Sequence, residues 1–325
     1  MSERFNLPQR RLRLAFFGTP DIAATCLDAL LEADEDDVAL VVCQPDRPKG
    51  RGRARALPPV KERALQADLP VEQTRKLKDG VLAARLREQS IDLGVVVAYG
   101  RILPLDLFTA PRFETLNVHA SLLPRHRGAS PIQHAILEGD AETGVTLMKL
   151  SEGMDEGPML LQRRLAIGDM TGGQLFEAVA ALGARTLVEG LAQAKEEGLE
   201  VRAQDDRAAS YAGMLKKEDG QLDLSAPAEA LARRIRAFDP WPGTVLAAPT
   251  GSLKVWAAQA HPLPGPAQPG ELLGPAFIGC GEGALELLEV QPPGKRRMSI
   301  GDFLRGRGKD WTPGETRFDF SRSDR

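Results

Sequence analysis

The residues best suited to chemistry lie in the stretch from Thr115 to Gln133. Asn117 and His119 stand two positions apart there, in a short apolar segment that reads as a strand. Residues two apart on a strand point to the same face of its sheet, so a carboxamide and an imidazole are presented together. The carboxamide can donate to an oxygen that gains negative charge, and the imidazole can act as a base. The pair therefore indicates acyl chemistry.

A third candidate, Asp155, lies in a loop at 151–158 that contains glycines and can reach His119. A carboxylate beside an imidazole fixes its tautomer. A lone histidine is more often a buried side chain that simply bonds a carbonyl group. Because Asn117 and Asp155 accompany His119, this purely structural interpretation is less favoured. This set requires no Ser or Cys nucleophile. It favours direct attack on a carbonyl carbon by an external nucleophile such as an amine.

A metal site is the alternative use of the histidines in this region. His119, His126 and His134 recur at wide spacing, but Pro124 and Pro131 break any shared helical face. The chain has only four histidines in all. We therefore predict no catalytic metal, and a metal-dependent hydrolase is kept as a competing hypothesis that a chelator would expose.

The elements that position these residues have the order of an α/β fold. Buried strands are expected at 12–17, 38–43 and 93–98, and helices at 60–67 and 81–89. The first helix is expected to have Thr19 as its N-cap with Pro20 at the first position, and a later helix to have Ser130 and Pro131 in the same roles. Further strands are expected at 145–150 and 158–167, with a long helix at 172–197. This pattern predicts a Rossmann-like, doubly wound, mostly parallel sheet, which binds ligands at the carboxyl ends of its strands.

The second half of the chain changes character. Short strands are expected at 221–224, 244–248, 253–260 and 284–290, separated by turns rich in Pro and Gly, with one helix at 227–238. Close spacing of short strands predicts a smaller, OB-like β-barrel. The expected organisation is a catalytic domain at 10–200, a linker at 201–217, the barrel at 218–311 and a disordered tail at 312–325.

Composition excludes several classes of protein. The chain has 325 residues, a net charge of −3 and three widely separated cysteines without a Cys-x-x-Cys pair, which argues against a disulfide scaffold. The first residues lack a signal-peptide run and no 18-residue apolar stretch occurs, so we expect a cytoplasmic protein. Neither a Gly-x-Gly-x-x-Gly fingerprint nor a phosphate-binding loop follows the first strand, so we predict no nicotinamide or nucleotide triphosphate cofactor.

A basic stretch follows the second expected strand. Its cations, set against the single acid Asp46, are Arg47, Lys49, Arg51, Arg53 and Arg55. Interspersed Pro and Gly exclude a stable helix, so a long loop is expected. Such a loop is either a solvated surface segment or an arm that contacts nucleic-acid phosphates, and the residues alone leave the two interpretations level.

These motifs resemble those of the folate-dependent formyltransferases. The resemblance rests on Asn117-Val-His119, the run 121–133, and Asp155 within Met-Asp-Glu-Gly-Pro. Segments 17–21, 44–52, 237–243 and 291–299 are similar to the subgroup that acts on tRNA, so the likeness extends from Leu12 to Trp311. His126 departs from the family pattern, in which an aromatic residue such as Tyr is usual.

The resemblance implies an enzyme that transfers a formyl group from 10-formyltetrahydrofolate to the α-amino group of initiator methionyl-tRNA. It implies that Asn117, His119 and Asp155 are catalytic. It also implies a folate site lined by Ser121, Leu122, Leu123 and Pro124. It implies a tRNA site that includes Arg47, Lys49, Arg51 and Arg53. The barrel would help to hold the tRNA, and a monomer is expected.

Two other hypotheses stay open on the sequence. One is a folate-dependent formyltransferase or hydrolase that acts on a small molecule, against which the basic arm and the barrel argue. The other is a non-catalytic RNA-binding protein on an old enzyme fold, which predicts no folate binding and function that survives His119→Ala.

Overall fold

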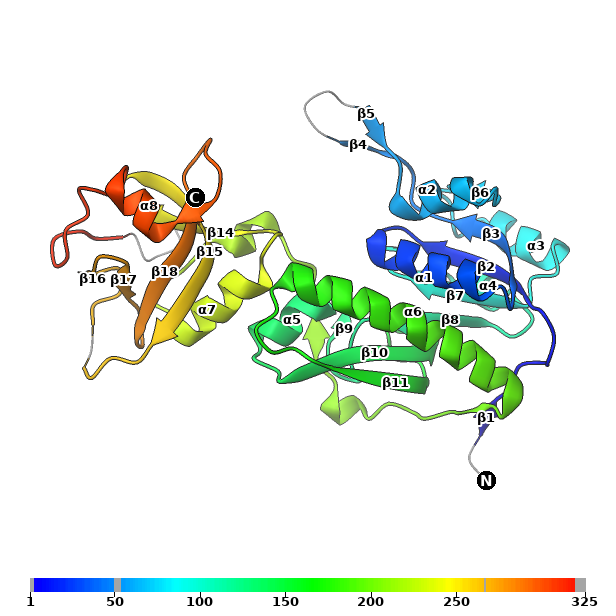
Figure 1. Cartoon of the computed structure of the whole chain (residues 1–325). Helices are drawn as coiled ribbons and strands as arrows, with labels where there is room; N and C mark the ends of the chain where they lie inside the picture. The colour runs from blue at the N-terminus through cyan, green and yellow to red at the C-terminus, as the bar shows by residue number, and fades with distance from the viewer. Residues whose placement is uncertain (1–2, 50–53, 266, 319–325) are drawn as a thin grey trace. The chain divides into compact units, whose positions relative to one another are not determined.

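The structure, a computed structural model, describes residues 3–49, 54–265 and 267–318 (Figure 1). The chain forms two compact units. The first comprises Met1–Ile132, Glu142–Ala166 and Phe176–Gly213, and the second comprises Gln133–Ala141, Ile167–Leu175 and Met214–Arg325. Across the described ranges, no helix is both long and apolar enough to span a membrane.

The first unit is built on a seven-stranded sheet in the order β11-β10-β8-β7-β2-β3-β6. Strands β8, β7, β2, β3 and β6 run parallel to one another, β10 runs antiparallel to β8, and β11 runs antiparallel to β10. In chain order the strands are β2 Arg13–Gly18, β3 Asp37–Val42, β6 Val71–Glu72, β7 Leu93–Val97, β8 Thr115–His119, β10 Glu142–Lys149 and β11 Met159–Ala166. The predicted mostly parallel sheet is confirmed. Its central strands are apolar runs, as expected for parallel strands that helices bury on both faces.

The helices of this sheet are α1 Asp21–Ala33, α2 Pro59–Gln66, α3 Val81–Glu88, α4 Leu105–Phe108 and α6 Gly172–Glu196. Figure 1 shows α1 and α6 lying across the sheet. A Cβ added to Gly183 of α6 would lie 3.4 Å from Val118 Cγ1 of β8, so α6 packs directly on that strand. The other face is covered by α3 and α4, whose apolar residues cluster with Phe17 of β2 and Val96 of β7.

This packing decides which way the candidate pair points. Side chains alternate along a strand, so Val118 faces α6 while Asn117 and His119 face away from it. Val96 is the register partner of Asn117 and belongs to the cluster under α3 and α4, which agrees with that orientation.

The start of α1 differs from the prediction. Its N-cap is Pro20 and its first residue is Asp21, one position later than expected. The Thr19 hydroxyl instead donates to the carbonyl oxygen of Tyr99 at 3.1 Å and accepts from the N–H of Gln44 at 3.3 Å. Thr19 therefore ties together the ends of three strands. In contrast, α5 (Pro131–Leu137) begins at Pro131 as predicted.

The expected basic loop contains a short antiparallel hairpin, β4 (Arg47–Lys49) with β5 (Ala54–Ala56). Arg51 and Arg53 lie outside the described residues. For Arg47 and Lys49 only the backbone is described. Two further strand pairs in the first unit are β1 (Arg4–Phe5) with β12 (Leu199–Glu200), and β9 (Arg127–Gly128) with β13 (Tyr211–Ala212).

The second unit contains an antiparallel sheet in the order β14-β15-β18-β17-β16, with β19 paired to β18. Its elements are η2 Lys217–Gly220, α7 Ala228–Ala237, β14 Thr244–Ala248, β15 Gly251–His261, β16 Leu272–Gly274, β17 Phe277–Gly279, β18 Ala284–Gln291, β19 Met298–Ser299 and α8 Ile300–Arg305. The predicted smaller β domain is confirmed, and its sheet is antiparallel. The prediction of a strand at 221–224 is wrong: Gln221 makes one bridge with Val245, and Leu222 and Leu224 enter the core from irregular backbone.

The described part of the expected tail, residues 312–318, packs onto the second unit. The N–H of Leu272 donates to Thr316 O at 3.2 Å, and the N–H of Phe318 donates to Gly270 O at 2.8 Å. The Phe318 ring is buried, with its centroid 4.9 Å from that of Trp311. Two aromatic rings thus order a stretch whose polar composition indicated disorder.

Candidate active site

Strand β8 holds Asn117 and His119 near the middle of the sheet. Both are almost fully buried, at 7% and 6% exposed. On the antiparallel neighbour β10, Met148 pairs with Asn117 and Thr146 pairs with His119. The sheet therefore fixes the backbone beneath both side chains.

The structure brings Asp155 to this pair. Its Oδ1 accepts from Asn117 Nδ2 at 3.3 Å and lies 3.6 Å from His119 Nδ1. Its Oδ2 accepts from the N–H of Gly128 at 2.9 Å. The three predicted catalytic side chains thus converge on one place, where a carboxamide, an imidazole and a carboxylate can act on a single carbonyl group.

The second nitrogen of the His119 ring faces a backbone oxygen. Nε2 lies 2.9 Å from the carbonyl oxygen of His126, so this histidine makes the carbonyl contact of an ordinary buried histidine as well as facing Asp155. Both ring nitrogens therefore point at acceptors. A ring with a proton on each nitrogen satisfies both contacts, whereas a neutral ring satisfies one.

His126 occupies an unusual backbone position next to this site. Its φ is 56°, a left-handed conformation that is uncommon for residues other than glycine. Its N–H donates to Ser210 Oγ at 2.9 Å, and its carbonyl oxygen is the one that meets His119. The turn at His126 thus aims a carbonyl group at the imidazole, a role that its residue type alone does not indicate.

The predicted folate-site residues form a tightly tied turn after β8. Thr146 Oγ1 donates to Ser121 O at 2.7 Å and accepts from the N–H of Leu123 at 3.1 Å. Gln162 Nε2 donates to Leu123 O at 2.9 Å. Ser121 and Leu123 are buried, whereas Leu122 and Pro124 are partly exposed. A ligand can therefore reach Leu122 and Pro124 most easily, with the other two supporting the turn.

A cavity of about 430 Å³ lies at the carboxyl ends of β2, β3 and β7. It is lined by Thr19, Pro20, Gln44, Pro45, Ala56, Leu57, Pro58, Ala98, Tyr99 and Gly100. Gln44 Nε2 donates to Tyr99 O at 3.2 Å, which joins two of its walls. Strand β7 is next to β8, so this cavity follows the strand beside the one that carries Asn117. Sequence reasoning missed it, although the rule on strand ends points to these loops.

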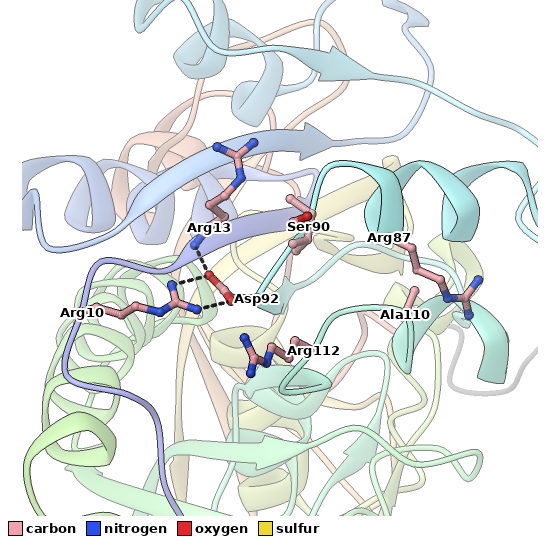
Figure 2. A pocket seen from close by; sticks show the side chains of 8 residues that line it. Arg10, Arg13, Arg87, Ser90, Asp92, Ala110 and Arg112 are labelled. Carbon is pink, nitrogen blue, oxygen red and sulfur yellow. Dashed lines mark hydrogen bonds and ion pairs between the residues drawn. The ribbon is translucent and has the colours of Figure 1, made fainter.

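A second cavity, of about 450 Å³, lies at the amino ends of the strands and is shown in Figure 2. Arg10 chelates Asp92 through two hydrogen bonds of 2.8 and 2.6 Å, and the N–H of Arg13 adds a third at 3.0 Å. The bonds from the Arg10 guanidinium hold the pKa of Asp92 below its ordinary value. Arg87 donates to Asp106 O at 3.1 Å. These arginines thus tie segments together at the edge opposite the candidate site.

Several of the arginines in the second unit also have structural partners. Arg233 Nε donates to Leu137 O at 3.1 Å, within this unit. The Arg297 guanidinium forms two hydrogen bonds with the Asp239 carboxylate, of 2.6 and 3.0 Å, and stacks 3.7 Å from the Trp256 ring centroid.

The possibility of a metal site can be checked directly. The described residues contain no group of three or more His, Cys, Asp or Glu side chains arranged to hold an ion.

Comparison with known proteins identifies relatives along almost the whole chain. The Formyl transferase family model matches residues 12–191, and the model of its C-terminal domain matches residues 214–308. A protein of Heliobacterium modesticaldum named methionyl-tRNA formyltransferase is 46% identical over 309 residues, covering 91% of this chain and 97% of its own. One of the same name from Myxococcus xanthus is 47% identical over 301 residues, covering 91% and 95%.

Solved structures share the fold at lower identity. The sugar 3N-formyl transferase WlaRD superposes with a TM-score of 0.63 at 16% identity, covering 88% of this chain and all of its own. HypX from Aquifex aeolicus, in a complex with tetrahydrofolic acid, gives a TM-score of 0.59 at 19% identity over 91% of this chain and 48% of its own.

Proposed function

The chain belongs to the formyl transferase family, and from that premise we propose that it transfers a formyl group from 10-formyltetrahydrofolate to the α-amino group of initiator methionyl-tRNA. The observation that carries the proposal is the convergence of Asn117, His119 and Asp155 within hydrogen-bonding or ion-pair distance. The relatives named for this activity are more than 40% identical over nine-tenths of the chain, so the acceptor they are named for is the best candidate here.

In the proposed reaction the amine nitrogen attacks the formyl carbon and forms a new C–N bond. The carbonyl oxygen becomes an oxyanion, and the attacking nitrogen must lose a proton. Collapse of the tetrahedral species breaks the bond to the folate nitrogen, which takes up a proton as it leaves. The free amine has a reference pKa of about 7.7–8.0, so a useful neutral fraction exists at neutral pH.

Each candidate residue has a defined part in this proposed reaction. Asn117 carries two N–H donors, of which one bonds Asp155 and the other can stabilise the oxyanion. His119 is proposed to carry the proton from the amine nitrogen to the folate nitrogen, and Asp155 Oδ1 lies 3.6 Å from its Nδ1. Asp155 holds the ring and the carboxamide together and compensates the charge of a protonated imidazole.

The cavity of about 430 Å³ is proposed to receive the acceptor end of the tRNA. Its proline and leucine side chains offer apolar surface for a methionine thioether or a terminal base, and Gln44 and Thr19 add polar groups. The folate donor is assigned to the side of Ser121, Leu122, Leu123 and Pro124. Such an arrangement brings donor and acceptor to Asn117 from neighbouring strands.

The rest of the tRNA is proposed to contact Arg47, Lys49, Arg51 and Arg53 of the basic stretch, with help from the second unit. Alternating Arg and Gly suit a segment that follows a phosphate backbone, and the net charge of −3 requires such contacts to be local. We further propose that the protein acts as a monomer in the cytoplasm, where charged tRNA is found.

The test mixes the protein with 10-formyltetrahydrofolate and charged initiator tRNA and measures formylmethionine. The wild-type protein should produce it, and His119→Ala should lower turnover by about 10²–10⁴-fold while tRNA binding stays near normal. Turnover within about tenfold of wild type would contradict a proton-transfer role for His119. Formylation of a small amine in place of methionyl-tRNA would favour a small-molecule enzyme.

A further inference from the structure

We propose that Gln204 and Arg127 are positioning residues that hold the Asp155 loop against the sheet. The segment after β12, which the sequence assigns to a linker, is then part of the active site. The assignment of catalytic importance to this contact rests on the proposed function, because that function gives Asp155 its role. The contact itself is independent of it.

Gln204 binds two backbone carbonyl groups of the Asp155 loop. Its Nε2 donates to the carbonyl oxygens of Asp155 at 2.7 Å and Gly157 at 2.8 Å. On the loop's other side, a Cβ added to Gly157 would lie 1.9 Å from the carbonyl oxygen of Lys149 in β10. The loop is therefore confined between a strand of the sheet and one glutamine amide.

Arg127 determines which way that amide points. Its Nε donates to Gln204 Oε1 at 3.0 Å, and a guanidinium has only donors. The amide oxygen must face Arg127, so the amide NH₂ group must face the loop. The Arg127 side chain is itself only 2% exposed, with its charge compensated by Asp206 at 2.7 Å. A buried, paired arginine thus fixes the orientation of the residue that fixes the loop.

Asp155 needs such a restraint because its backbone is in an uncommon state. Its φ is 55°, in the left-handed region that residues other than glycine seldom adopt. Strained backbone of this kind persists only where its surroundings enforce it. Gln204 bonds the carbonyl group of that same residue, while the carboxylate makes the contacts to Asn117 and His119. Loss of the Gln204 donors would let the peptide relax and move the carboxylate.

The chain around Gln204 is anchored to the same region at further points. Strand β13 pairs with β9, so that Tyr211 lies opposite Arg127, and the N–H of Arg127 donates to Ser210 O at 2.8 Å. Residues up to Gly213 belong to the first compact unit. Three segments far apart in the sequence therefore meet here: 126–128, 155–157 and 204–212.

The decisive variant is Gln204→Glu in the full-length protein. A glutamate has the same shape and still accepts from Arg127, but it has no N–H for the two loop carbonyl groups. We expect kcat for formyl transfer to fall about 10–100-fold, since displacements near 1 Å have effects of this size, with KM for both substrates little changed. The pH profile of kcat should also shift, because the position of Asp155 relative to His119 changes. The matched control is Gln66→Glu, an exposed glutamine whose Oε1 accepts from Arg63 at 3.2 Å, and it should behave as wild type.

Amide hydrogen exchange of the protein without substrates provides a readout besides activity. Gln204→Glu should speed exchange of the Gly128 amide, whose N–H donates to Asp155 Oδ2, and leave β8 and the thermal midpoint near wild type. Unchanged exchange of that amide would overturn the proposal, as would faster exchange with unchanged kcat. If the wild-type protein fails to formylate methionyl-tRNA, the proposed function is wrong, and the exchange result still decides whether Gln204 holds the loop.

Discussion

Gly128→Ala is the substitution that tests the geometry of the site most directly. Gly128 has a φ of 112°, which favours glycine strongly over any residue with a side chain. Its N–H donates to Asp155 Oδ2 at 2.9 Å. Any shift of this residue therefore removes a hydrogen bond from the carboxylate that faces His119.

The cost of the substitution has two parts. Placing alanine in this conformation costs about 1–3 kcal/mol. The added Cβ would also lie 2.7 Å from the carbonyl oxygen of Ala212 in β13. That oxygen cannot move aside freely, because it accepts from the N–H of Ala129 at 2.9 Å and of Ser130 at 3.3 Å. Overpacking of this kind adds about 1–3 kcal/mol, so the expected loss of stability is roughly 2–6 kcal/mol.

The assay is calorimetric unfolding combined with the formyl-transfer rate. Calorimetry is needed because the three tryptophans, Trp241, Trp256 and Trp311, all lie in the second unit, where fluorescence would not report on this site. Relief of strain and clash should separate β9 from β13, so kcat should fall about 10–100-fold. The control is Gly80→Ala, at a φ of 75° with no atom within 4 Å of the added Cβ, which isolates the conformational cost.

Two results would refute this reasoning. Equal destabilisation by Gly128→Ala and Gly80→Ala would mean that β13 yields to the extra methyl group. Full destabilisation with wild-type kcat in the folded fraction would mean that the Gly128 N–H does not position Asp155.

The remaining predictions concern the two charged regions of the first unit. Replacing Arg51 and Arg53 by Ala should weaken tRNA binding and reduce the slope of log affinity against log salt by about 1–2, since each lost phosphate contact removes nearly one; an unchanged slope would leave these charges merely solvated. Asp92→Asn should lower the thermal midpoint of the protein at neutral pH, because it removes a charged acceptor from Arg10. A carboxyl group whose pKa is lowered by folding stabilises the folded protein at pH values above its unfolded pKa of about 3.9. It loses that contribution as the pH falls through the pKa of the folded state. Because folding lowers the pKa of Asp92, the difference in thermal midpoint between Asp92→Asn and wild type should shrink in acid. A difference that stays constant down to the lowest pH at which the protein remains folded would contradict this origin.

The sequence predicts the parts of the fold that depend on local pattern. Strands β2 and β7 are apolar runs buried within the sheet, and their bounds agree with the prediction to within a residue or two. Asn117 and His119 could be paired because strand alternation is a local property. The error at Thr19 has a tertiary cause, since its hydroxyl serves Tyr99 and Gln44 in place of the helix end.

The contacts that position Asp155 could not be predicted in this way. Gln204 stands in a polar, irregular stretch, and nothing nearby in the sequence distinguishes it from a surface glutamine. Its importance comes from two carbonyl groups 47 and 49 positions away. Arg127 looks like one more surface cation, yet it is 1% exposed. Long-range hydrogen bonds to backbone groups leave no periodicity or composition by which to find them.

The register of β10 explains why the site needs these restraints. Lys149 pairs with Leu116, and the N–H of Leu150 donates to Thr115 O at 3.0 Å, so β10 ends beside the amino end of β8. The loop that follows thus starts at the wrong end of the strand to reach His119. It must fold back across the face of the sheet, and a short loop rich in glycine has little apolar surface to hold it there. Hydrogen bonds from Gln204 and Gly128 hold the loop where packing does not. The segment after β12 is therefore needed because β10 runs antiparallel to β8.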